Sequence, residues 1–285
     1  MQAEPYRLEM PRDWSTSVIF ASPHSGAVYP EDFMQRTILC RPQIRSSEDA
    51  FVDTLFAAAP GMGAPLLAAT APRAFVDLNR APDELDSALV SGIGSSGSNP
   101  RVSSGLGVIP RVVANGRAIY RGKIPLQEAR ERLKSVWFPY HDRLSALVDS
   151  CRAQFGEAIL IDCHSMPHEA IDAISRNGKS PDIVLGDRFG ASADPAVVDL
   201  VETSFAALGL KVARNSPFAG AYTAQAYGRP CRGQHVVQIE IDRALYMDED
   251  RIEPNANFGT LRDAVSYVIG EITDYGRSRT AMAAE

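Results

Sequence analysis

Two of the five histidines in this 285-residue chain stand where hydrolytic chemistry would need them. His24 follows the apolar run Val18–Ala21, and His164 follows the apolar run Ala158–Ile161, so each lies just past the predicted end of a strand. Strand ends of one sheet share an edge, where two imidazoles can converge on one metal ion. A single strand-end histidine is more often structural, and the repeated pattern is what favours metal ligation by His24 and His164.

A carboxylate is the expected third ligand. Two histidines and one carboxylate leave a zinc ion one position for water, as hydrolytic sites require. Glu48 and Asp49 follow Ser46-Ser47 at the start of a predicted helix over 49–58, and on position alone either could supply the carboxylate. Asp162 stands two residues before His164 on the same face of a strand and could orient its imidazole, with an ordinary hydrogen bond as the alternative.

An apolar run over Phe75–Leu78, predicted as a strand, ends in Asn79 and Arg80. A guanidinium binds a carboxylate through two parallel hydrogen bonds, so these residues predict a receptor for a small anionic substrate. Pairing of Arg80 with a surface acid nearby is the alternative. Arg111 is a further candidate for contacting the substrate, although a solvated loop position is the more common role for such an arginine.

Glu240 lies in the strongly apolar run Val236–Ile241, and strand alternation places it on the same face as Gln238. A carboxylate on an inner sheet face is costly to bury unless it is paired or takes part in chemistry. Glu240 is therefore the candidate general base that takes a proton from water at the metal. An outward-facing strand charge is the alternative.

These residues need a sheet to position them, and the apolar pattern predicts one. Short runs typical of buried strands alternate with segments of helical period, which predicts an α/β protein with a mixed, largely parallel sheet flanked by helices. One predicted helix starts near Leu126 and should be kinked or interrupted at Pro139. A second starts at the caps Ser192 and Asp194, and a third starts near Leu261. The predicted strands are Val18–Ala21, Leu66–Ala68, Phe75–Leu78, Ala158–Ile161, Ile183–Leu185 and Val236–Ile241, and the stretch from Ser91 to Gly107 is expected to be a loop.

Composition excludes several classes of protein. A formal charge of −6 argues against a nucleic-acid partner, and no apolar stretch reaches the roughly 20 residues needed to span a bilayer. The residues from Met1 to Trp14 do not resemble a signal peptide, so we expect a cytoplasmic protein whose four scattered cysteines are reduced. We expect residues 1–285 to form a single catalytic domain; the sequence does not determine the oligomeric state.

Five motifs, taken in order, resemble the N-formylglutamate amidohydrolase family. They are Ser-Pro-His-Ser-Gly at 22–26, Glu-Asp at 48–49, Val-Asp-Leu-Asn-Arg at 76–80, Asp-Cys-His-Ser at 162–165 and Gln-Ile-Glu at 238–240. The family is similar in fold to zinc carboxypeptidases and aspartoacylases, a phosphorylase/hydrolase-like architecture. The resemblance implies one catalytic Zn²⁺, with His24 and His164 as ligands and Glu240 as base. It favours Asp49 over Glu48 as the acidic ligand.

The resemblance also implies a reaction. Asn79 and Arg80 would bind the substrate carboxylate, Arg111 would help to hold the developing oxyanion, and N-formyl-L-glutamate and water would give formate and L-glutamate in amino-acid catabolism. A related N-acyl amino acid deacylase or a small carboxypeptidase is the first alternative. A metal-free binding protein for acidic metabolites is the second.

Overall fold

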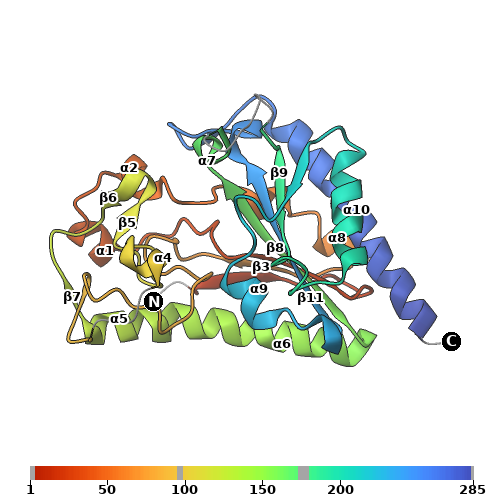
Figure 1. Cartoon of the computed structure of the whole chain (residues 1–285), viewed down its shortest axis with the longest axis horizontal. Coiled ribbons are helices and arrows are strands. Elements are labelled where there is room, and N and C mark those ends of the chain that lie inside the picture. The colour runs from red at the N-terminus through yellow and green to blue at the C-terminus, as the bar shows by residue number, and fades with distance from the viewer. Residues whose placement is uncertain (1–3, 95–98, 173–179, 284–285) are drawn as a thin grey trace.

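The computed structural model describes residues 4–94, 99–172 and 180–283, and a seven-stranded mixed sheet runs through its centre (Figure 1). Strands β3, β2, β8 and β11 are mutually parallel, whereas β1 and the pair β9-β10 run antiparallel to the neighbours that they join. This confirms the predicted α/β class. Across the sheet the order is β1 (Tyr6–Glu9), β3 (Leu66–Ala69), β2 (Val18–Ser22), β8 (Ala158–Met166), β11 (Gln234–Asp242), β9 (Ile183–Gly186) and β10 (Val212–Arg214).

Long helices cover both faces of the sheet (Figure 1). One face carries a continuous run of α5 (Leu126–Arg132), the π-helical segment η3 (Leu133–Trp137) and α6 (Phe138–Phe155). The other face carries α8 (Pro195–Ala206) and α10 (Phe258–Ala283). The short helices are α1 (Glu31–Arg36), α2 (Arg41–Arg45), α3 (Val52–Leu55), α4 (Pro100–Ser103), α7 (His168–Asp172) and α9 (Tyr222–Tyr227), with 3₁₀ turns η1 (Pro60–Met62), η2 (Ala114–Gly116), η4 (Pro230–Arg232) and η5 (Arg243–Leu245).

Three small two-stranded sheets lie outside the central one. They pair β4 (Val90–Ser91) with β7 (Ile124–Pro125), β5 (Val112–Val113) with β6 (Arg117–Ala118), and β12 (Met247–Asp248) with β13 (Glu253–Pro254). The first two pairs and α4 belong to the part of the chain that stands beside the main sheet in Figure 1. This part supplies one wall of the cavity described below.

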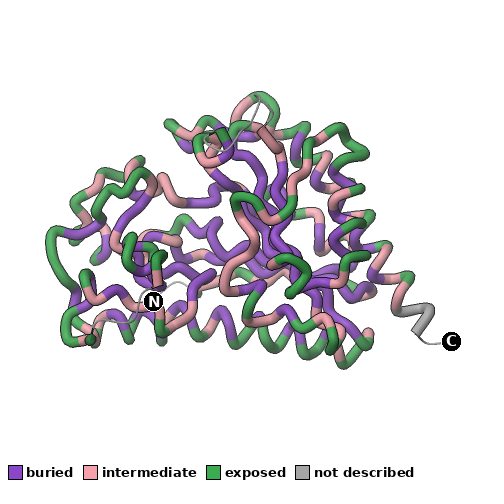
Figure 2. Tube along the Cα trace, viewed as in Figure 1, coloured by how far each residue is buried: buried purple, intermediate pink, exposed green. Residues whose placement is uncertain are grey.

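Strand alternation divides the core into two layers. Val18 and Phe20 of β2 pack in one apolar cluster with Val265 of α10, whereas Ile19 of the same strand packs in another with Leu144 of α6. Successive side chains of a strand point to opposite faces, and burial of each such side chain contributes about 1.5 to 3 kcal/mol. Buried residues accordingly trace the strands and the inner sides of the helices in Figure 2.

The predicted helices that start near Leu126, at Asp194 and near Leu261 are confirmed, the first with one refinement. Helix α8 begins where expected, since the Asp194 side chain accepts a hydrogen bond from the Ala196 backbone N–H. In the α5–α6 run the π-helical segment η3 ends at Trp137, two residues before Pro139. Proline has no N–H to donate to the preceding turn, and a widened turn accommodates it without ending the helix.

Two predicted elements are wrong. Phe75–Leu78 is buried in part but forms no strand. The Phe75 and Val76 N–H groups donate back to the Pro72 carbonyl in a turn, and the Asp77 N–H donates to the Val108 carbonyl. The helix expected over 49–58 is reduced to the four residues of α3, since Phe51 adopts a left-handed backbone conformation at its start. Both segments hold buried apolar side chains, which the sequence pattern does detect.

Most of the predicted loop from Ser91 to Gly107 is irregular, with α4 as one helical turn; residues 95–98 lie outside the described ranges. Among the helices that the structure describes, none combines the length and apolar character needed to cross a membrane.

Candidate active site

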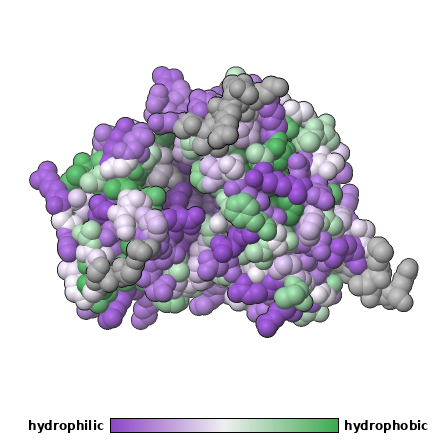
Figure 3. All heavy atoms as spheres, viewed as in Figure 1, coloured by the Kyte–Doolittle hydropathy of each residue, from purple (hydrophilic) through white to green (hydrophobic). Residues whose placement is uncertain are grey.

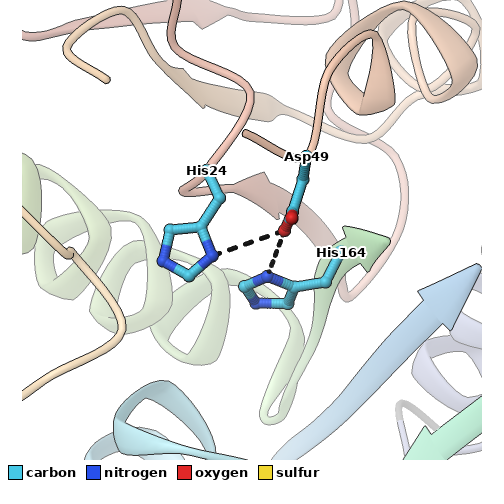
Figure 4. Close-up of side chains that lie close together, drawn as sticks. All are labelled: His24, Asp49 and His164. Carbon is cyan, nitrogen blue, oxygen red and sulfur yellow. Dashed lines mark hydrogen bonds and ion pairs between the residues drawn. The ribbon is translucent and has the colours of Figure 1, made fainter. Parts of the chain in front are cut away.

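Three buried side chains meet near the carboxyl ends of the central strands (Figure 4). His24 follows β2, Asp49 precedes α3, and His164 lies in β8. The Asp49 Oδ2 atom lies 2.9 Å from Nδ1 of His164 and 3.3 Å from Nδ1 of His24. One ligand atom from each residue falls within 4.8 Å of the others, so one ion could contact all three.

The donor atoms of this cluster fit a divalent metal. Nδ1 of His24 is buried and makes no hydrogen bond, which is uncommon for a buried polar atom. Two imidazole nitrogens and one carboxylate oxygen form a ligand set that zinc binds in hydrolytic sites. The cluster therefore has the chemistry of a three-residue zinc site with room for a further ligand.

Each imidazole is fixed from behind by a second carboxylate. Asp77 Oδ1 lies 2.8 Å from Nε2 of His24, and Asp162 Oδ2 lies 3.1 Å from Nε2 of His164. In a neutral imidazole, a carboxylate at Nε2 favours the tautomer with the proton on that nitrogen, which leaves the lone pair of Nδ1 directed at the cluster. Both rings are therefore oriented for ligation through Nδ1.

Asp49 is ionised in this environment. Burial alone would raise the pKa of its carboxyl, but hydrogen bonding to His164 and the proximity of His24 hold that pKa well below its usual value. Nη2 of Arg243 also donates to Asp49 Oδ1 at 2.9 Å. Burial lowers the pKa of His164, but Asp162, Asp49 and Glu240 outweigh it, so the pKa lies well above its usual value.

Glu240 stands beside His164 because the parallel register of β11 and β8 pairs these two residues. Its side chain lies at the cavity, and Gln238 Nε2 donates to Glu240 Oε1 at 2.8 Å. Burial raises the pKa of Glu240 to about 7; His164 opposes that shift and Asp49 adds to it. A carboxyl that titrates near neutrality is suited to accept and return a proton.

The cluster opens into a cavity of about 550 Å³. His24, His164 and Glu240 line it, and so do four arginines: Arg73, Arg80, Arg101 and Arg243. Figure 3 shows the corresponding face of the molecule hollowed and rich in hydrophilic side chains. The arginines make this cavity suited to an anionic ligand.

Arg80 and Asn79 both reach this cavity. Arg80 Nε donates to the Leu106 carbonyl at 3.0 Å, and its Nη1 donates to the Asn79 carbonyl at 2.7 Å. The Asn79 amide already has partners at both ends: its Nδ2 donates to Asp162 Oδ2 at 3.2 Å, and its Oδ1 accepts the Thr223 N–H. Asn79 Nδ2 also lies 3.0 Å from Nε2 of His164. Asn79 therefore contacts a residue of the three-residue cluster, in addition to its predicted role of binding the substrate carboxylate.

Helix α6 and the turn before it hold the segment that carries these residues. The Trp137 indole N–H donates to the Arg80 carbonyl at 2.9 Å, and His141 Nε2 lies 2.9 Å from the Leu78 carbonyl. Burial lowers the pKa of His141 to about 4, so its ring is neutral and donates one hydrogen bond. Trp137 and His141 thus hold in place the segment around Leu78 and Arg80, which does not belong to any strand.

Two predicted site residues lie elsewhere. Glu48 is held by Tyr29 and by a two-pronged ion pair with Arg45, and it is not part of the three-residue cluster. Arg111 does not line the cavity; its Nε pairs with Asp86 Oδ2 at 2.8 Å, and its Nη2 donates to the Ser103 carbonyl. Each side chain is occupied by partners within the protein, which sequence position could not reveal.

Three further residues at the site were not singled out from the sequence. Asp77 lies inside the motif at 76–80, but its partner His24 is 53 positions away. Arg73 pairs with Asp77 at 3.0 Å. Arg243 is the first residue after β11 and pairs with Asp49. Each of the three is a charged residue that lies within a predicted strand or two residues from its end, and this position was the available signal in the sequence.

Comparisons with known proteins agree with this geometry. A family model described as N-formylglutamate amidohydrolase matches residues 16–247. An N-formylglutamate deformylase of Pseudomonas aeruginosa is 35% identical over 240 residues, which cover 82% of this chain and 84% of the relative. One from Pseudomonas putida is 31% identical over 235 residues, covering 81% and 82%. The crystal structure of N-formylglutamate amidohydrolase from Ralstonia eutropha JMP134 superposes with a TM-score of 0.91 at 34% identity, covering 97% of this chain and 99% of that one.

Proposed function

The chain belongs to the N-formylglutamate amidohydrolase family, and from this membership and the site we propose that it hydrolyses N-formyl-L-glutamate to formate and L-glutamate. The observation that carries the proposal is the position of Glu240. It is paired across the sheet with His164 of the cluster suited to a metal, and it lines the cavity that the four arginines also line. An amide hydrolase for anionic substrates needs these three features in one place.

We further propose that His24, Asp49 and His164 hold a zinc ion. When bound, zinc would lower the pKa of water and polarise the formyl carbonyl. Asp77 and Asp162 keep the two imidazoles in the required tautomer. The Nδ1 atom of His24 makes no hydrogen bond, and this supports the assignment, because a bound ion would satisfy it.

Glu240 serves as the general base and then as the general acid. Its carboxylate takes a proton from the attacking water, and the protonated form returns it to the amine as the C–N bond breaks. The pKa of about 7 supports both roles, since both the ionised and the protonated form of the Glu240 carboxyl are populated near neutral pH. Gln238 holds one carboxylate oxygen and leaves the other for the reacting groups.

The arginines bind and polarise the substrate. Arg80 anchors a carboxylate of the N-acyl amino acid, and its hydrogen bonds to two backbone carbonyls hold it in place. Asn79 keeps contact with His164 and Asp162, so we assign it to orienting the cluster in addition to its expected contact with substrate. Arg73, which lines the cavity and influences the pKa of Glu240, takes the oxyanion-stabilising place expected for Arg111.

The test is formate release by the purified protein, loaded with zinc or stripped by a chelator. We expect N-formyl-L-glutamate to be hydrolysed by the zinc-loaded protein and not by the stripped one. N-acetyl-L-glutamate and dipeptides ending in glutamate serve as the comparison. Turnover of those substrates without formate release would favour a related deacylase or carboxypeptidase. Full activity without any metal would remove the zinc assignment.

A further inference from the structure

The four arginines of the cavity differ in whether a carboxylate neutralises them. Arg73 Nε lies 3.0 Å from Asp77, and Arg243 Nη2 lies 2.9 Å from Asp49. Within residues 4–94, 99–172 and 180–283, no carboxylate oxygen lies within 4.0 Å of a guanidinium nitrogen of Arg80 or Arg101. Two cations at this cavity therefore have no direct counter-charge from the described protein.

The backbone of one residue connects these two arginines. The Leu106 N–H donates to the Arg101 carbonyl at 2.9 Å, and the Leu106 carbonyl accepts from Arg80 Nε at 3.0 Å. Arg101 belongs to α4 and is exposed, whereas Arg80 is buried. The two guanidinium groups thus belong to one wall, with Arg80 deep in the cavity and Arg101 at its rim.

The helix turn that carries Arg101 is held in place. Arg111 Nη2 donates to the Ser103 carbonyl at 3.2 Å, and the Arg111 backbone N–H donates to the Gly105 carbonyl at 2.8 Å. Asp86 fixes the Arg111 side chain through its Nε. Arg111 therefore fastens the segment that presents Arg101 to the cavity.

The charges of Arg80 and Arg101 act on each other. Burial lowers the pKa of Arg80, and Arg101 is among the cations that lower it further. Asp77 opposes this shift, but its oxygens already contact Arg73 and His24. Like charges on one wall are unfavourable until an anion joins them, so a ligand with two negative groups would be favoured over a ligand with one.

We propose that Arg101 determines specificity by binding the side-chain carboxylate of the substrate while Arg80 binds its α-carboxylate. This inference rests on the proposed function and adds to it the residue that distinguishes a dicarboxylic substrate from its amide. An amide or an alkyl group in place of the second carboxylate leaves Arg101 without a partner. Such substrates should be hydrolysed at the same cluster with lower kcat/KM.

The test compares two substrates and three variants of the zinc-loaded protein. N-formyl-L-glutamate and N-formyl-L-glutamine differ only in the second carboxylate. Arg101→Gln should lower kcat/KM for the glutamate derivative roughly 10-fold to 100-fold and change it less than about 2-fold for the glutamine derivative. Arg101→Lys should retain part of the preference, because it keeps the charge and loses the fork geometry. Arg130→Gln, which removes an exposed arginine on α5, is the control and should change neither value.

Equal losses of Arg101→Gln on both substrates, or no loss on either, would overturn the inference while the proposed function stands. Failure of the wild-type protein to release formate from N-formyl-L-glutamate would overturn the proposed function instead. In that case, binding of L-glutamate and L-glutamine, measured by calorimetry in wild type and Arg101→Gln, decides the inference. Loss of the preference for L-glutamate in the variant supports it, and an unchanged preference contradicts it.

Discussion

The Oδ1 atom of Asp77 lies 2.8 Å from Nε2 of His24, while the other ring nitrogen of His24 faces Asp49. A full carboxylate at Nε2 fixes the proton there, and an amide holds it less firmly. Asp77→Asn should therefore weaken zinc binding about 10-fold to 100-fold, measured by titration against a competing chelator. Asp53→Asn removes a carboxylate that pairs with Arg7 and should not change the affinity. Equal affinity in Asp77→Asn and wild type would contradict this role.

His164→Ala should lose both the metal and the hydrolysis of N-formyl-L-glutamate. The variant removes one of three ligands and leaves Asp49 without the hydrogen bond to Nδ1 of His164. Metal content by elemental analysis and formate release are the measurements. His168→Ala is the matched control, because His168 is exposed in part and pairs with Asp242 outside the cluster. A stoichiometric metal in His164→Ala would rule out ligation by this residue.

Glu240→Gln should keep the metal and lose at least about 100-fold in kcat, the usual order for a positioned acid–base group. The base must be unprotonated in the free enzyme, so kcat/KM of the wild type should rise with pH and reach half of its plateau at or below about pH 7. A bound cation can only lower that value. The increase of kcat/KM with pH should be absent in Glu240→Gln. Retained activity in Glu240→Gln would remove the base assignment.

The raised pKa of Glu240 also predicts how stability depends on pH in the metal-free protein. The folded carboxyl titrates at about 7 and the ordinary one at 4.5, so between these values the unfolded chain releases its proton first. Raising the pH through that window therefore destabilises the fold, by up to about 3 kcal/mol once both states are ionised. Denaturant unfolding should find Glu240→Gln more stable than wild type at about pH 8 and equal to it at about pH 4. The same difference at both pH values would contradict the predicted shift.

Arg80→Ala should raise KM for N-formyl-L-glutamate at least about 10-fold and leave the zinc content intact. Arg80 contacts two backbone carbonyls but none of the three cluster residues, so its loss removes an anchor for the substrate and not a ligand. Initial rates over a range of substrate concentrations, together with elemental analysis, test both halves. An unchanged KM would count against the anchoring role.

The sequence predicts best what strand order controls. His24, His164 and Glu240 come together because β2, β8 and β11 are adjacent parallel strands, and the apolar runs locate these strands. The predicted end of β8 at Ile161 is wrong, because the strand continues through His164 to Met166. Phe75–Leu78 was predicted wrongly as a strand because burial selects the same apolar residues in a turn, whose N–H groups donate back to Pro72. Arg111 and Glu48 could not be judged from the sequence, because their partners Asp86 and Tyr29 are brought to them only by the fold.

The segment that carries α4, β5 and β6 lies outside the seven-stranded sheet, although it forms part of the cavity wall. Its attachments include the ion pair of Arg111 with Asp86 and the Leu106 carbonyl that accepts from Arg80. An engineer could therefore exchange residues 99–118 for the corresponding stretch of a relative. The rest of the protein would keep the residues that carry out the reaction, and the new segment would determine which N-acyl amino acids bind in the cavity.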